Sequence, residues 1–108
     1  MLDRMRERYI DRYCAALDET KRTTPFGPHT IIWTVRDHVF AAYTVGGAGV
    51  SLRAEDRAQA HRLVAEGKAI RVEYLREGVW VLLAWSTPPD ELRFQIFSSY
   101  ELVAATAG

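Results

Sequence analysis

Apolar side chains recur at intervals of three and four residues near both ends of the chain, a spacing that is typical of amphipathic helices. The pattern predicts one helix over residues 2–18 and another over residues 88–103. A third helix is expected over residues 54–66, because Gly67 follows at the point where a helix commonly ends. Three helices therefore flank and divide the rest of the chain.

Between these helices, apolar and polar residues alternate with a period of two, as they do in half-buried strands. Strands are expected at residues 30–35, 39–45, 50–53, 70–74 and 78–85. Prolines and glycines interrupt residues 19–29, which are expected to form a loop. The order α-β-β-β-α-β-β-α is dominated by hairpins. It predicts a single α+β domain over residues 1–108, with an antiparallel sheet of about five strands and helices packed on one face.

The strand over residues 78–85 is the most apolar of the set. Trp80 and Trp85 fall on opposite faces of it, because their positions differ by an odd number. At least one of these tryptophans is therefore expected to face away from the helix-covered core. We expect Trp80 to pack against the apolar stripe of the last helix, near Tyr100.

The charge balance limits the classes of partner. Among the 108 residues, 14 Lys and Arg balance 14 Asp and Glu, so the formal net charge is zero. Domains that bind nucleic acid through its phosphates usually carry a basic surplus. The single cysteine excludes an intrachain disulfide and favours a reducing, cytoplasmic location. No apolar run approaches the length of a membrane span, and no membrane partner is expected.

Residues with catalytic or metal-binding chemistry are present but are not arranged in a known pattern. His29, His38 and His61 lack the spacing of a helical zinc site, and Cys14 lacks an activating sequence context. The glycines of residues 46–49 lead into a strand, whereas a phosphate loop leads into a helix. We therefore expect a binding module that is not an enzyme and that has no catalytic residues, metal or cofactor.

Aromatic residues cluster around the predicted sheet and the loop that precedes it. They suit a stacking platform for a planar ligand, although packing in the core is the more common explanation of such residues. The candidate ligand-binding residues are Phe26, Trp33, Tyr43, Trp80 and Trp85.

Basic residues at the predicted hairpin turns suggest a different partner. Arginines on projecting hairpins can contact DNA phosphates, although they also serve solubility alone. The candidate nucleic-acid-binding residues are Arg36, His38, Arg71 and Arg76. Asp37 and Glu77 lie beside them in the sequence and would weaken phosphate attraction.

Several short segments resemble, in the same order, those of the MmcQ/YjbR family, most clearly over residues 30–104. They are Phe40-Ala41, Val50-Ser51-Leu52-Arg53, Leu63-Val64, Gly78-Val79-Trp80-Val81, Pro89-Asp90-Glu91-Leu92 and Ser99-Tyr100-Glu101-Leu102-Val103. The resemblance implies a compact frataxin-like fold, in which helices back an antiparallel sheet.

The resemblance also implies two alternative functions. Members of this family are often described as DNA-binding proteins with two hairpin wings, and they have no established enzymatic activity or cofactor. Some occur beside antibiotic-biosynthesis genes, which implies drug binding or self-resistance. This sequence has His38 where the family often has a lysine, and a neutral imidazole weakens a phosphate contact. The partner is thus either duplex DNA, bound through the hairpin tips, or a sequestered planar aromatic molecule.

Overall fold

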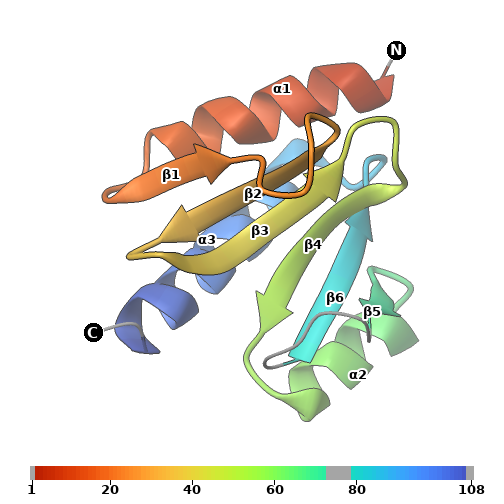
Figure 1. Cartoon of the computed structure of the whole chain (residues 1–108). Coiled ribbons are helices and arrows are strands. Elements are labelled where there is room, and N and C mark those ends of the chain that lie inside the picture. The colour runs from red at the N-terminus through yellow and green to blue at the C-terminus, as the bar shows by residue number, and fades with distance from the viewer. Residues whose placement is uncertain (1, 73–78, 107–108) are drawn as a thin grey trace.

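The computed structural model describes residues 2–72 and 79–106. Its elements are α1 (Leu2–Ala15), β1 (Thr20–Thr23), β2 (Thr30–Val35), β3 (His38–Thr44), β4 (Gly49–Ala54), α2 (Arg57–Ala65), β5 (Ile70–Val72), β6 (Val79–Ala84) and α3 (Pro89–Thr106). The strands pair antiparallel throughout, in the order β1-β2-β3-β4-β6-β5 (Figure 1).

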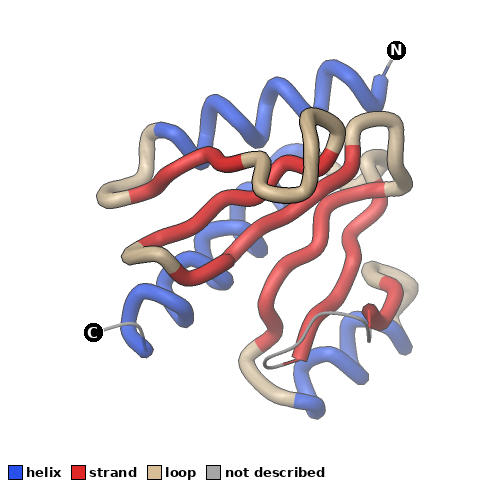
Figure 2. Tube along the Cα trace, in the orientation of Figure 1, coloured by secondary structure: helices blue, strands red, loops and turns tan. Residues whose placement is uncertain are grey.

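The helices lie together on one face of the sheet, while the loop between β1 and β2 lies in front of the other face (Figure 2). α3 packs against β3 and β4, α1 packs against α3 and β1, and α2 packs against β5 and β6. This arrangement confirms the predicted α+β class with helices on one face. Within the described residues, none of the helices has the length and hydropathy needed to cross a membrane.

The expected loop over residues 19–29 contains β1, an edge strand that the sequence pattern did not predict. Glu19 turns the chain with a positive φ of 63°. The Thr20 hydroxyl then donates hydrogen bonds to the carbonyls of Cys14 (2.8 Å) and Leu17 (3.0 Å), which closes the end of α1. β1 is short and polar, and it packs mainly against β2 and α1.

The core lies between the sheet and the helices. Its largest fully buried side chains come from every layer: Ile10, Ile31, Val35, Phe40, Val50, Leu52, Val81, Leu83, Trp85, Leu92, Ile96 and Val103. α1 contributes Ile10 and Cys14, whereas Leu2 and Met5 near its start are exposed.

The expected contact between Trp80 and α3 is wrong. Val81, Leu83 and Trp85 belong to the core cluster, so the alternation of β6 turns Trp80 to the helix-free face. Tyr100 instead packs edge-on against Phe40, with ring centroids 5.5 Å apart. The expectation that one tryptophan faces away from the core is confirmed, and that tryptophan is Trp80.

Candidate functional site

The helix-free face of the sheet is hollowed into a groove of about 1050 Å³. The side chains along its middle form one row across the sheet, because the strand register places them opposite one another. The row comprises Thr23, Ile32, Ala42, Ser51 and Leu82. Ala42 and Ser51 are small and lie between the larger Ile32 and Leu82, so the face is lowest at its centre. We call this feature the open-face groove.

The loop between β1 and β2 forms one wall of the open-face groove. Pro25 and Phe26 line the groove from this loop, and the Phe26 side chain is 80% exposed. Gly27 gives the loop its turn with a φ of 116°, and its N–H donates to the Thr24 carbonyl. At the loop's end, the N–H of Val45 donates to the His29 carbonyl at 2.7 Å. The large apolar ring of Phe26 is thus exposed to water at the edge of the groove.

Few charges face the open-face groove. Among its described lining residues, only Asp37 and Arg53 carry a full charge at neutral pH, and His38 is the one histidine. Asp37 forms an exposed ion pair with Lys21, with Nζ and Oδ1 3.9 Å apart. The rest of the described lining consists of hydroxyl, apolar and glycine residues. The groove therefore suits a largely apolar ligand.

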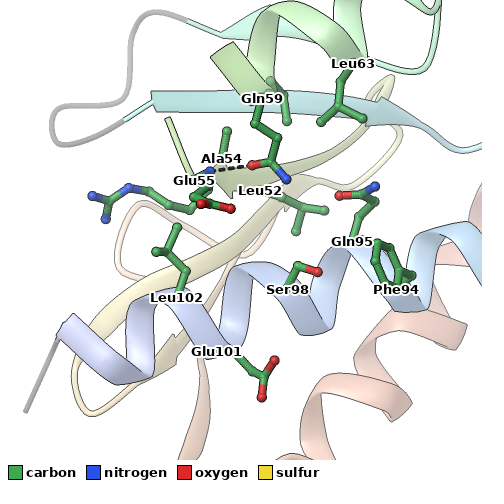
Figure 3. Close-up of a pocket in the computed structure, with 12 residues that line it drawn as sticks. Leu52, Ala54, Glu55, Gln59, Leu63, Phe94, Gln95, Ser98, Glu101 and Leu102 are labelled. Carbon is green, nitrogen blue, oxygen red and sulfur yellow. Dashed lines mark hydrogen bonds between the residues drawn. The ribbon is translucent and has the colours of Figure 1, made fainter. Parts of the chain in front are cut away.

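A second cavity, of about 520 Å³, lies on the other side of the sheet between α2 and α3. Figure 3 shows Gln59 reaching into it from α2, and Gln95 and Ser98 reaching into it from α3. The N–H of Glu55 donates to the Gln59 side-chain oxygen. Arg53 lines both this cleft and the open-face groove.

Three of the five candidate aromatic residues point toward the helices. The Nε1 of Trp33 and the hydroxyl of Tyr43 donate to the two carboxylate oxygens of Asp11 on α1, at 2.9 and 2.8 Å. Trp85 is buried and donates from Nε1 to the Gly47 carbonyl at 3.0 Å. Burial and the hydrogen bond to Asp11 raise the pKa of Tyr43. Tyr43 reaches the groove lining, but Trp33 and Trp85 do not.

The two other candidate aromatics, Phe26 and Trp80, lie at the open-face groove. Trp80 sits opposite Arg53 in the register of β4 and β6, and only 5% of its surface is exposed. It forms part of the groove floor, whereas Phe26 rises at its edge. The structure thus brings together two aromatics that are far apart in the sequence.

The described candidate residues at the hairpin tips lie in different parts of the structure. Arg36 and Asp37 form a two-residue turn with φ values of 51° and 69°, the backbone of a primed hairpin turn without its usual glycine. The Nε of Arg36 donates to Glu19 at 3.0 Å, and Nη1 donates to the Ala104 carbonyl at 3.3 Å. This first tip is therefore bound to the turn between α1 and β1 and to α3. His38, the first residue of β3, is exposed at the groove edge.

The remaining two tip candidates lie elsewhere. Arg71 is in β5, opposite Val81, at the edge of the sheet farthest from β1. Arg76 lies outside the residues that the structure describes. β4 and β6 separate β5 from the β2–β3 hairpin.

Sequence reasoning missed Ile32, Ala42, Ser51, Arg53 and Leu82 as candidate site residues. A signal for some of them was present, since apolar residues occupy both faces of residues 31–33 and 79–85. Such unbroken runs indicate strands that are apolar on both sides. No comparable pattern singles out Arg53.

In the described part of the chain, no group of three or more His, Cys, Asp and Glu residues is placed to hold a metal ion.

Comparison with curated protein sequences finds no significant match. The fold is similar to that in the crystal structure of Deinococcus radiodurans protein DR2400, which contains a DUF419 domain. The match has a TM-score of 0.77 and 19% sequence identity, and it covers 92% of this chain and 78% of the other. The family model described as YjbR matches residues 15–102. Because this match spans most of the sequence, the chain belongs to the YjbR family.

Proposed function

We propose that this protein is a non-catalytic binding module that holds a planar aromatic small molecule in the open-face groove. The observation that carries the proposal is a largely apolar groove with few charged residues and an exposed phenylalanine at its edge. Its volume of about 1050 Å³ lies just above the range of typical ligand pockets, roughly 300–1000 Å³.

Phe26 gives this proposal an energetic basis. An exposed phenylalanine forfeits roughly 1.5–3 kcal/mol relative to a buried one. A flat ligand lying over Ala42 and Ser51 would cover the groove floor and bring its own ring beside Phe26. Aromatic pairs in offset or edge-on contact contribute roughly 0.5–1.5 kcal/mol beyond area burial. The loop that carries Phe26 is thus suited to closing over a bound ring.

DNA binding, the other function that the resemblance implies, has less support. Arg36 is occupied by Glu19 and the Ala104 carbonyl, and the chain has no basic surplus. A domain that released counterions from several phosphates would need a cluster of free cations. The sequestering role implied by the family resemblance fits a small ligand better. Because the sequence has no recognisable catalytic constellation, bound compound should be recovered chemically unchanged.

Isothermal titration calorimetry with 2-naphthamide, a neutral planar probe, tests the proposal. We expect saturation at one ligand per chain and little dependence of the affinity on salt. Ala42→Phe fills the groove from the open face and should abolish binding, and Phe26→Ala should weaken it. Phe94→Ala, a control at an exposed aromatic on α3, should bind like the wild type.

A parallel titration with a short DNA duplex separates the two functions. Binding to DNA that falls steeply with salt, together with no binding of the naphthalene probe, would overturn the small-molecule proposal. Equal affinity of the probe for Ala42→Phe and for the wild type would also overturn it, because the ligand would then lie elsewhere.

A further inference from the structure

Arg53 is unusual among the residues of the open-face groove. It is half-buried on β4, opposite Trp80, and its Nε is fully buried without a hydrogen-bond partner. In the described structure, no acidic side chain lies within ion-pairing distance of it. By contrast, Arg22 is paired with Asp11 and Arg36 is paired with Glu19. Arg53 is therefore a partly desolvated cation that has no counterion among residues 2–72 and 79–106.

A partly desolvated cation in a ligand site favours ligands that carry an anionic group or hydrogen-bond acceptors. Removing a guanidinium from water is costly unless an anion or hydrogen-bond acceptors replace the lost hydration. A carboxylate suits this purpose because its two oxygens match the donors of a guanidinium. Because the Nε atom of Arg53 is buried, a ligand would contact this side chain through its terminal nitrogens.

The surroundings of Arg53 limit the charge and the shape of the ligand. Ser51 lies two residues earlier on the same face of β4 and lines the groove, and among the described residues its hydroxyl makes no hydrogen bond. Asp37 also lines the groove, and its partner Lys21 offsets its charge. One cation without a counterion in the described part of the chain, beside a largely apolar groove, matches a single negative charge on a flat apolar body. A polyphosphate would carry excess negative charge here.

We infer that the open-face groove selects an aromatic monocarboxylate, with its ring over Ala42 and Ser51 and its carboxylate at the terminal nitrogens of Arg53. This inference rests on the proposed function, and it adds the charge and the orientation of the ligand. Arg53 acts in it as the specificity-determining residue.

Calorimetric titrations with 2-naphthoate and 2-naphthamide test the inference, because the two probes share a ring system and differ in charge. We expect the wild type to bind the carboxylate about tenfold more tightly than the amide, as a charge-assisted hydrogen bond would produce. Arg53→Met keeps the apolar stem and should remove this preference without changing the affinity for the amide. Arg53→Lys should retain part of it.

Arg57→Met is the matched control, since Arg57 is exposed on α2 and lines neither cavity. It should leave the affinities for both probes unchanged. Circular dichroism melting curves show whether each variant folds. Because Arg53 also borders the cleft between α2 and α3, Ala42→Phe and Ser98→Phe locate the anion. Loss of naphthoate binding in Ala42→Phe alone supports the inference.

Each contrary result has one meaning. Equal affinity of the wild type for both probes, or equal weakening of both by Arg53→Met, overturns the inference and leaves the proposed function standing. Loss of naphthoate binding in Ser98→Phe alone places the anion in the cleft and overturns it as well. Failure of both probes to bind the wild type overturns the inference together with the proposed function.

Discussion

The Ser99 hydroxyl on α3 donates a 2.7 Å hydrogen bond to the backbone carbonyl of Phe40 on β3. The same oxygen accepts a 2.9 Å hydrogen bond from the backbone N–H of Arg53 on β4. The register that pairs Ala41 with Leu52 would next place Phe40 opposite Arg53. The side chain of a helix thus replaces one link of the sheet, at the point where β3 and β4 diverge (Figure 1).

Ser99→Ala should destabilise the protein by about 1–3 kcal/mol, because it leaves a buried N–H and a buried carbonyl without partners. Urea denaturation monitored by tryptophan fluorescence measures the change in the free energy of unfolding. Ser98→Ala, at the half-buried neighbouring position, should stay within about 0.5 kcal/mol of the wild type. Similar losses in the two variants would show that the bridge contributes nothing specific.

Gly49→Ala should destabilise the protein by at least about 2 kcal/mol. A Cβ at this position would overlap the backbone carbonyl of Leu83, and backbone cannot move aside without breaking the β4–β6 ladder. Gly46→Ala is the control. Gly46 has open space around it but a φ of 79°, so its change should cost about 1 kcal/mol from strain alone. Thermal denaturation of both variants shows which of them is less stable. A larger loss of stability in Gly46→Ala would contradict this account.

The Cys14 thiol should be inert in the folded protein. It is fully buried, and burial, followed by the charge of Asp11, raises its pKa. Because the thiolate is the reactive form, native protein at neutral pH should react with an aromatic disulfide reagent only as fast as it unfolds. Protein in concentrated urea should react at once. Rapid stoichiometric labelling of native protein would mean that α1 does not shield this position.

Tyr43 should make stability fall at alkaline pH. Its folded-state pKa is raised above the ordinary tyrosine value of 10.0, chiefly by burial and then by the hydrogen bond to Asp11. The folded protein therefore keeps a proton that the unfolded chain releases. This stabilisation is complete below pH 10 and is lost as the pH rises through the folded-state pKa.

Tyr43→Phe should flatten the decline of unfolding free energy above pH 10. At neutral pH, this variant should lose roughly 1.5–3 kcal/mol, since the hydrogen bond to a charged acceptor disappears. Urea melts across the alkaline range measure both effects. An unchanged slope would show that Tyr43 ionises equally well in the folded and the unfolded protein.

The sequence by itself determined the elements whose residues follow a period. Helical spacing predicted α1 and α3, and alternation predicted β2, β3, β4 and β6 within a residue or two of their bounds. These patterns are local, because a helix or strand must put its apolar residues on the side that is buried. The antiparallel α+β class followed from the order of the elements and the short links between them.

Only the tertiary structure decided what depends on partners distant in the chain. β1 has four polar or charged residues and exists because it pairs with β2. Ser99 is buried on α3 because its hydroxyl completes the hydrogen bonding of two strands. Period two separates Trp80 from Trp85 but does not say which face the helices cover, since β6 is apolar on both. The groove has the same origin, because the small Ala42 and Ser51 lie between the larger Ile32 and Leu82 only when four strands align, and this alignment is set by long-range pairing.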